Sequence, residues 1–563
     1  MSSKSITTGL SGGSSILSRT AWYSFSLCVF PLLLTLFNSR WLFVDLEKIQ
    51  IDPWIYLGFS LDLKAHLKAF YGTYYATRLP WILPGYLAHK LFSPFVANFV
   101  LHMTFYYVSL FSLFRTLKRT VGLRAAFLTA LLMGFYIPAL REFGSNYITG
   151  AALAYLFLTT SFLTYPNRSK YSPLYLFFAG VFCSCFLFTQ LFLVVFIPLV
   201  ALFYLLLNRP HTLKFLLMNM VFFTIGFVTT TSIFCWINNA ITGHFLFFEP
   251  IYKWTKDFVK IDNMWWLPLS SWDWSLQFII GIAGALFFGS ILTLIFRREK
   301  IISIFSFYYI INFFLFVFGD ILFKQPVMQL HYYFCYIFPA LFLAIGGILS
   351  SFLNQISGKK YYGLVAFAII VGFYGCLTND LQKDQLIRVN IIVIFSIGVL
   401  SITFFFLKKR VFSYAGTILL IGAFFMTNSC FTPAANVQSK TLKNTFSSVV
   451  KGIRATYSLD PSLSSLFWYR SNDCYRCISS AYLWQYRLVN EDFPNLGNII
   501  GGDTSRLNNK KIYLLTGPEE APLEEANKSL VSVGLKGEML KEIIVREDDI
   551  KIKISHIHVT EID

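Results

Sequence analysis

The segment from Asp45 to Pro84 gathers the residue types that move protons and bind anions. It reads DLEKIQIDPWIYLGFSLDLKAHLKAFYGTYYATRLPWILP, and it combines acids, bases, a histidine and several tyrosines in a chain of which only 13% of residues are charged. A carboxylate near a membrane surface can take the proton from an attacking hydroxyl group. A guanidinium can hold a phosphate through two hydrogen bonds. The segment therefore predicts a site that handles a hydroxyl and a phosphate together.

Asp52 is the first candidate, in the sequence IDPWIYLGF. An acid at this point can cap the next helix, with Pro53 at the first helical position. It can also serve as the base that accepts, or the charge that orients, an acceptor hydroxyl. The two roles are compatible, because a capping aspartate at a fixed elbow is well placed to face a pocket.

Arg78 is the second candidate, in YYATRLPWILP. An arginine near the membrane surface can simply extend to lipid headgroups. Here the following Leu79–Pro80 predicts a backbone held in extended geometry, and a guanidinium held in place suits a phosphate. Tyr74 and Tyr75 would add hydroxyl donors or stack on a sugar, although tyrosines are also common at membrane interfaces.

Other polar residues are predicted to lie near this pair. Glu142 and Asn146 occur in the short loop REFGSNYITGAAL, where Asn146 is equally suited to cap a helix. His331 and Tyr332 begin a late apolar run, where they would either meet water or hold a phosphate from the opposite wall.

Two further features of the loops predicted to be external are explained without a role in chemistry. The stretch LDLKAHLKAFYG, with His66 and Lys68, has the spacing of a helix that lies on the membrane surface. The acids of loop 239–276 lack any recognisable metal-ligand spacing. We therefore predict no cofactor and assign no metal ligand, while leaving a divalent metal open.

The elements that must position these residues are membrane helices. The chain has 563 residues and a mean hydropathy of +0.59, and a span needs roughly 20 apolar residues. The pattern predicts a polytopic α-helical membrane protein with about thirteen transmembrane helices, of which the pair covering 172–207 could be one bent or re-entrant segment. The expected spans lie near 22–44, 92–114, 124–140, 148–165, 172–187, 190–207, 214–238, 277–296, 301–322, 332–353, 361–378, 389–407 and 411–430.

Charge gives these spans an orientation. With thirteen spans, the basic clusters between apolar runs all fall on one side, which the positive-inside rule makes cytoplasmic. The net charge of +18 is thus explained by topology, and no nucleic-acid partner is predicted. We expect a multi-pass protein of a bacterial inner (plasma) membrane with a cytoplasmic N-terminus, and we expect loop 45–91 to be external, with interfacial helices.

The tail differs in character from the rest of the chain. Residues 1–430 form the predicted membrane domain, and residues 431–563 are predicted to form a soluble α+β domain on the external, periplasmic face. Strands are expected at Lys511–Leu515, Ile543–Val545 and Ile550–Ile554, and a helix near Pro522–Val531. Cys474 and Cys477 are too few for a structural zinc site and would instead suit a disulfide.

The order of these features resembles the C-type membrane glycosyltransferases, in the branch of protein O-mannosyltransferases and the aminoarabinose transferase that acts on lipid A. The likeness covers about 430 residues and rests on Asp52 after the first span, Arg78-Leu79-Pro80, and His331-Tyr332 before a helix containing Pro339. It implies inverting transfer from a polyprenyl-phosphate sugar to a lipid, glycan or protein hydroxyl on the outer face. By the same likeness, Asp52 would be catalytic and Arg78 would bind the carrier phosphate.

One departure from that family keeps alternatives open. Many members have an acid in the second external loop, where this chain offers Glu142 and Asn146, and an amide cannot take a proton. Either Glu142 substitutes, or Asp52 works alone, or catalysis is impaired and the protein only binds glycans. A transporter or flippase of a lipid-linked or polar solute is the competing hypothesis, but such proteins place ionisable groups near mid-membrane, whereas the candidates here cluster in external loops.

Overall fold

A computed structural model of the full chain provides the structure. It describes residues 20–29, 32–33, 52–144, 147–165, 172–208, 213–252, 268, 290–291, 300–354, 356–377, 421, 466–469, 512–516, 522–531, 534–547 and 550–561.

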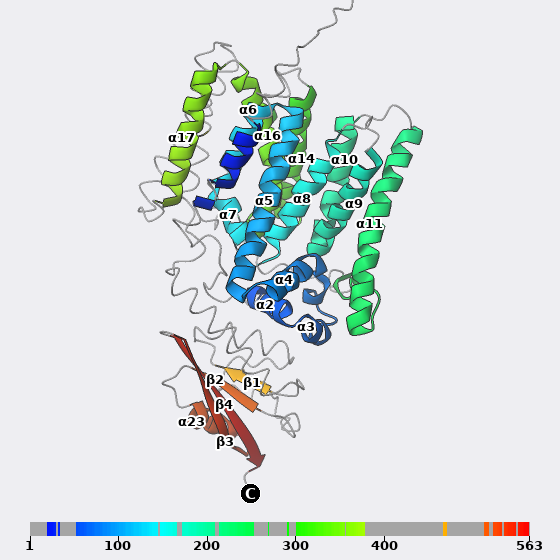
Figure 1. Cartoon of the computed structure of the whole chain (residues 1–563). Helices are drawn as coiled ribbons and strands as arrows, with labels where there is room; N and C mark the ends of the chain where they lie inside the picture. Colours follow the sequence, from blue (N-terminus) through cyan, green and yellow to red (C-terminus); the bar gives the residue numbers. More distant parts are fainter. Residues whose placement is uncertain are drawn as a thin grey trace, which may run out of the picture.

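Most of the described residues form a bundle of long apolar helices (Figure 1). Six helices are long and apolar enough to cross a membrane, or seven with one bent pair, counted over the described residues alone. The expectation of a polytopic α-helical membrane protein is thereby confirmed, while the number thirteen stays a prediction. The bundle helices are α5 (Pro94–Thr120), α6 (Leu123–Gly134), α7 (Ile137–Gly144), α8 (Thr149–Leu163), α9 (Ser172–Thr189), α10 (Ile197–Asn208), α11 (Leu213–Thr242), α14 (Lys300–Ile321), α16 (Phe338–Leu353) and α17 (Gly358–Leu377).

Two helix breaks interrupt the apolar runs, one inside a span expected to be continuous and one between two spans that were expected to be separate or bent. The span expected at 124–140 is two helices, α6 and α7, which meet at a 62° bend. The pair expected at 172–207 is α9 followed by the 3-10 helix η4 (Leu191–Phe196) and α10, with Gln190 extended between them. Both breaks place short segments and polar groups near one end of the bundle. Spans expected at 389–407 and 411–430 lie outside the described residues, apart from residue 421.

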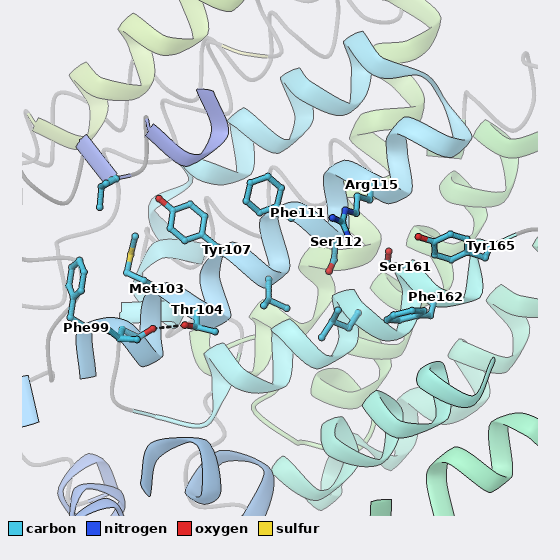
Figure 2. Close-up of a pocket in the computed structure, with 14 residues that line it drawn as sticks. Phe99, Met103, Thr104, Tyr107, Phe111, Ser112, Arg115, Ser161, Phe162 and Tyr165 are labelled. Atoms are coloured by element: carbon cyan, nitrogen blue, oxygen red, sulfur yellow. Dashed lines mark hydrogen bonds between the residues drawn. The ribbon is translucent and has the colours of Figure 1, made fainter. Parts of the chain in front are cut away.

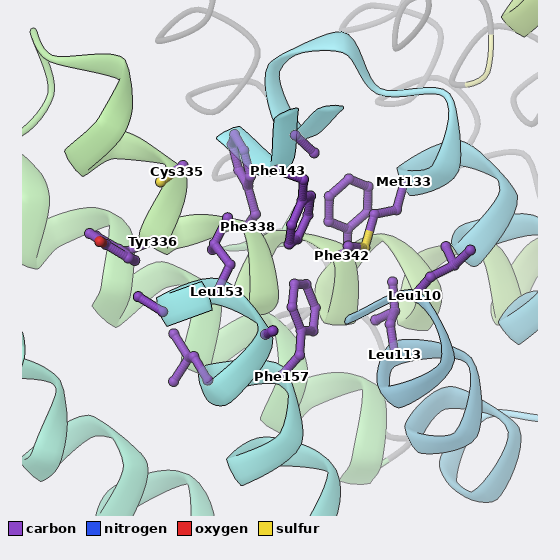
Figure 3. Close-up of a cluster of buried hydrophobic side chains, with 14 of the residues drawn as sticks. Leu110, Leu113, Met133, Phe143, Leu153, Phe157, Cys335, Tyr336, Phe338 and Phe342 are labelled. Carbon is purple, nitrogen blue, oxygen red and sulfur yellow. The ribbon is translucent and has the colours of Figure 1, made fainter. Parts of the chain in front are cut away.

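Helix α16 lies at the centre of the bundle. In the most apolar 18-residue stretch within Tyr332–Leu353, 94% of residues are buried, against 22% in the corresponding stretch of α11. Aromatic and aliphatic side chains from α5, α6, α7 and α8 surround it, as Figure 3 shows around Phe338 and Phe342. Tyr332 lies in α15 (His331–Phe334), which is joined to α16 by the 3-10 helix η6 (Cys335–Ile337), so the packing of the core restricts the position of that residue.

Helices α9 and α11 pack unusually closely. A Cβ atom added to Gly180 would lie 2.0 Å from the carbonyl oxygen of Phe223, and one added to Gly226 would lie 2.0 Å from that of Phe177. Only glycine permits this approach of two backbones, as in other membrane helix pairs with small residues at the contact. The hydroxyls of Ser184 and Thr231 add a hydrogen bond of 3.0 Å across the same pair.

Three short helices lie together at one end of the bundle (Figure 1). They are α2 (Asp52–Leu61), α3 (Leu63–Ala69) and α4 (Leu79–Leu91), with the 3-10 helix η3 (Tyr75–Thr77) between the last two. Asp62 caps α3 by accepting a 3.0 Å hydrogen bond from the backbone N–H of Ala65. This is the external loop predicted from the sequence, folded into helices.

His66 departs from its expected place at the membrane interface. Lys64 and Lys68 are exposed as expected, but His66 is buried, with its ring packed against Phe59 and Phe70. The cause is local: Gly58 of α2 has no side chain, and a Cβ there would lie 2.1 Å from Nε2 of His66. The glycine therefore opens the space that the imidazole fills.

The described residues of the tail form a four-stranded sheet in the order β1-β2-β4-β3. Strands β1 (Leu466–Tyr469) and β2 (Ile512–Thr516) are parallel, and β3 (Leu535–Glu547) and β4 (Ile550–Glu561) are an antiparallel pair. Helix α23 (Pro522–Val531) packs on β3, and the side chain of Asn527 bonds both backbone groups of Gly537. The expected strands and helix are present, while the domain boundary at 430 stays a prediction.

Candidate active site

Asp52, the first residue of α2, is bound to the segment that precedes Arg78. The hydroxyl of Tyr75 in η3 donates a 2.7 Å hydrogen bond to Oδ1 of Asp52. Burial first, and then the adjacent Asp52 carboxylate, raise the pKa of Tyr75 far above its usual 10, so this hydroxyl stays a donor. The second oxygen of Asp52 accepts no hydrogen bond from any described residue. One carboxylate oxygen is thus fixed and the other is available.

Arg78 is buried at the start of α4, with 5% of its surface exposed. Its backbone (φ −88°, ψ 44°) is not extended, so that expectation is wrong: Arg78 ends η3 and immediately precedes α4, and Pro80 is accepted within the first turn of α4. Nη1 donates to the hydroxyl of Tyr56. Nε is buried and has no partner in the described part of the chain.

Three tyrosines surround this guanidinium, and we call them the Arg78 tyrosines: Tyr56, Tyr74 and Tyr147. Cζ of Arg78 lies 4.7 Å from the ring centre of Tyr74, 5.6 Å from that of Tyr56 and 5.7 Å from that of Tyr147, within the range of cation–π attraction. Burial raises the pKa of Tyr56 and Tyr147 well above 10. The cation is therefore held by neutral rings and no described residue neutralises it by an ion pair.

Asp52 and Tyr56 share one face of α2 because they are four residues apart. Tyr56 bonds Arg78, and Tyr75 bonds Asp52. The rings of Tyr56 and Tyr75 lie 6.0 Å apart, edge to face. The two proposed functional groups are therefore connected through two packed tyrosines.

The opposite wall comes from α15 (His331–Phe334), the turn before the central helix. The ring of Tyr332 packs edge to face on Tyr147 at 6.0 Å and on Tyr333 at 4.6 Å. The carboxylates of Asp52 and Glu142 both lie close enough to Tyr332 to interact with its hydroxyl electrostatically. Tyr332 therefore contacts Tyr147 and lies near both Asp52 and Glu142, while its expected role in binding a phosphate stays a prediction.

Glu142 is buried in α7, with 3% of its surface exposed. It interacts electrostatically with Tyr332, Cys335 and Tyr336. The 62° bend between α6 and α7 is what turns this residue away from the direction of the span and toward α15. A second acid therefore lies close to Tyr332 and to Cys335, which begins the 3-10 helix before α16.

Comparison with known proteins adds a fold to this geometry. No protein-family model matches the sequence, and no curated protein matches it significantly. Among solved structures, ArnT from Cupriavidus metallidurans bound to undecaprenyl phosphate matches with a TM-score of 0.52 and 12% identity, over 96% of this chain and 98% of that one. The chain has the ArnT fold. The structure of the same protein in the apo state matches over the same shares of both chains, with a TM-score of 0.51 and 11% identity.

The ArnT fold confirms the resemblance drawn from the sequence, at the level of architecture. Since a fold alone does not carry a function, the roles of the individual residues rest on the site. Asp52, Arg78, Tyr74, Tyr75 and Tyr332 are brought together, with Glu142 beside Tyr332.

Some expected site residues lie outside what the structure describes. Asn146 is one of them, and of His331 only the backbone, at the start of α15, is described. The acids Asp257, Asp262 and Asp273, and both tail cysteines, also lie outside. Among the described residues, no three His, Cys, Asp or Glu side chains gather as a metal ion would require.

Four residues of the ArnT-fold site were missed from the sequence: Tyr56, Tyr147, Tyr333 and Gln190. Tyr56 was detectable, because its spacing from Asp52 puts both on one helix face, and Tyr147 directly follows Asn146. Gln190 was not, since it lies inside an apolar run. It occupies the break after α9, where its Oε1 lies 3.3 Å from the hydroxyl of Tyr336 and its side chain also bonds Tyr333.

Proposed function

We propose that this protein is an inverting glycosyltransferase that moves a sugar from a polyprenyl-phosphate carrier to a hydroxyl group on the outer face of the membrane. The observation that carries the proposal is the pairing of a carboxylate, Asp52, with a guanidinium, Arg78, that forms no ion pair with any described residue, in one tyrosine-lined site. The fold supports it, since the matched ArnT structure is bound to undecaprenyl phosphate.

Arg78 is the proposed phosphate ligand. Burying a charged donor without a partner is costly, yet Nε of Arg78 is buried and has no hydrogen-bond partner among the described residues. A phosphate oxygen would supply the missing partner, and a charge-assisted bond of this kind is stronger than one between neutral groups. Burial acts to lower the pKa of Arg78, but the surrounding tyrosine oxygens and Asp52 raise it well above its usual value. The group is therefore a permanent cation for the leaving phosphate.

Asp52 is the proposed base. The acceptor hydroxyl attacks the anomeric carbon from the face opposite the phosphate and gives its proton to the free oxygen of Asp52. The bond between the anomeric carbon and the phosphate oxygen breaks, and the carrier phosphate keeps the electron pair beside Arg78. A single displacement of this kind inverts the anomeric centre. Most of the catalysis then comes from positioning and charge stabilisation.

Glu142 is the proposed second acid of the site. The carboxylates of Glu142 and Asp52 both interact electrostatically with the hydroxyl of Tyr332. In this position it would orient the acceptor or the sugar through Tyr332 rather than replace Asp52. The acceptor class is a lipid, a glycan or a protein, presented from the side of α2–α4.

The deciding experiment uses the purified protein in proteoliposomes with a radiolabelled polyprenyl-phosphate sugar and extracted envelope acceptors. Formation of a new glycosidic bond, lost in Asp52→Asn but retained in a surface variant such as Lys64→Gln, is the expected result. Vectorial movement of the labelled lipid with no new bond would instead establish the transporter alternative. Mass analysis of surface glycans with and without the gene would then identify the sugar and acceptor.

A further inference from the structure

A second anion-binding feature lies on α5, away from the candidate active site. A groove of about 620 Å³ runs along one face of α5 toward α8, a size typical of small-ligand sites. The α5 residues that line the groove recur every fourth position, so the groove follows one side of the helix. The lining residues are Leu32, Phe99, Val100, Met103, Thr104, Tyr107, Val108, Phe111, Ser112, Arg115, Leu158, Ser161, Phe162 and Tyr165.

The groove is apolar at one end and polar at the other (Figure 2). Toward Phe99 the few hydroxyls are used internally: Thr104 bonds the carbonyl of Val100 at 2.7 Å, and Tyr107 bonds that of Cys28 at 2.6 Å. Toward the other end, the side chains of Ser112, Arg115, Ser161 and Tyr165 gather in Figure 2. Such a gradient matches a ligand with an apolar chain and a polar head.

The polar end carries positive charge that no residue in the described ranges neutralises. Arg115 is exposed to the groove and has no ion-pair partner among the described residues, and the hydroxyl of Ser112 has no partner there either. Arg119 lies beside them, bonded to Ser161 and Thr164 and stacked 3.9 Å over Tyr165, with its Nε buried and unpaired. Two arginines with no described carboxylate at hand form a site for an anion.

The geometry points to a glycerophospholipid with an anionic headgroup: we infer that its acyl chain lies in the groove and its phosphate binds Arg115. Phe99 and Arg115 are separated by about 24 Å along the helix axis, which exceeds the roughly 15 Å that one leaflet contributes to a hydrocarbon core of about 30 Å, so the groove is long enough for a whole acyl chain. Arg115 belongs to the basic cluster predicted to be cytoplasmic, and that leaflet carries the anionic lipids that basic pockets between membrane helices bind.

The sugar carrier fits this groove less well than a phospholipid does. The proposed carrier phosphate binds Arg78 at the start of α4, while Arg115 lies near the opposite end of α5 (Figure 1). An isoprenoid tail that extends from Arg78 along α5 would bring no charge to Arg115. The inference therefore concerns a separate lipid and does not depend on sugar transfer.

The test measures lipid retention by the full-length protein in mild detergent, using native mass spectrometry with added phosphatidylglycerol or phosphatidylcholine. We expect preferential retention of phosphatidylglycerol, reduced about tenfold by Arg115→Gln, which is the size of one charge-assisted bond. Lys118→Gln is the matched control: it removes an exposed cation three residues away on the same helix that does not line the groove. It should change retention less than twofold.

A second variant keeps the inference testable if Arg115→Gln proves unstable. Val108→Trp fills the middle of the groove and leaves the arginines intact, so it should also release phosphatidylglycerol. Equal retention of the two phospholipids, equal losses in Arg115→Gln and Lys118→Gln, or competition by undecaprenyl phosphate for the same bound position would each overturn the inference.

Discussion

The hydroxyl of Tyr75 donates a 2.7 Å hydrogen bond to one carboxylate oxygen of Asp52. These residues are 23 positions apart in the chain, so the bond closes the loop formed by α2, α3 and η3 onto its own beginning. Because Arg78 follows η3 directly, the same bond fixes the distance between the carboxylate and the guanidinium. The site is therefore organised by a neutral tyrosine rather than by a direct ion pair.

The first prediction concerns the base. Asp52→Asn keeps the size of the side chain and an oxygen that can accept from Tyr75, but removes the group that takes the proton. We expect transfer to fall by about 10²- to 10⁴-fold, with thermal stability unchanged. Initial rates with purified protein and labelled donor would measure this, and a variant with normal rates would remove Asp52 from the mechanism.

The second prediction separates positioning from chemistry. Tyr75→Phe deletes only the hydroxyl that orients Asp52, so we expect kcat to fall by about tenfold with little change in KM for the donor. Tyr71→Phe is the control, because Tyr71 belongs to the same loop but stacks on His244, 3.9 Å away. If Tyr71→Phe lowers kcat equally, the effect is on the loop as a whole and not on the carboxylate.

The third prediction concerns the phosphate. Arg78→Lys keeps the charge but loses the planar fork that can bond two oxygens and stack on the Arg78 tyrosines. We expect KM for the polyprenyl donor to rise by about 10- to 100-fold. Arg124→Lys provides the matched change elsewhere, since Arg124 also lies over a tyrosine ring, at 5.4 Å from Tyr361. Equal KM values in the two variants would argue against a phosphate at Arg78.

The sequence predicted the membrane fold and most of the site for physical reasons that can be named. Long apolar runs leave few alternatives to membrane helices, and charged groups such as Asp52 and Arg78 stand out against them. The bend before α7 was missed within the span expected at 124–140, although Pro138 directly follows it and proline interrupts helices. The break between the spans expected at 172–187 and 190–207 was placed correctly, but only the tertiary structure shows that the Gln190 side chain there contacts Tyr336.

The contacts of buried aromatic residues were also not predicted from the sequence. The spacing of four residues puts Tyr56 on the same helix face as Asp52, but tyrosines are common at membrane interfaces, so the spacing does not reveal which group Tyr56 bonds. Only the tertiary structure shows that it bonds Arg78. His66 illustrates the converse, because its expected interfacial position was overturned by one glycine, Gly58, on a neighbouring helix.

That histidine leads to the fourth prediction, on pH. Burial lowers the pKa of His66 to about 4 from its usual 6.5, and Asp62 opposes the shift. The folded protein binds this proton less readily than the unfolded chain, so the contribution to stability is complete above pH 6.5 and is lost as the pH falls toward 4. The full loss is about 3 kcal/mol.

Thermal inactivation in detergent at pH 7.5 and pH 5 would measure the effect. The wild-type protein should be less stable at the lower pH, and His66→Gln, which has no proton to gain, should show a smaller difference between the two. An identical difference in both proteins would assign the pH dependence to other groups.

The last prediction concerns the packing of α9 against α11. Gly180→Ala places a methyl group within 2.0 Å of the backbone carbonyl of Phe223, which no side-chain rotation can relieve. The helices must separate, at a cost of about 1–3 kcal/mol for overpacking, and the hydrogen bond between Ser184 and Thr231 would be strained with them.

Gly347→Ala is the control, because its new methyl group would meet only ordinary contacts, 3.4 Å from Ile302. We expect the melting temperature to fall in Gly180→Ala and to stay level in Gly347→Ala, where alanine also favours the helix. A Gly180→Ala protein as stable as the wild type would show that α9 and α11 do not pack this closely.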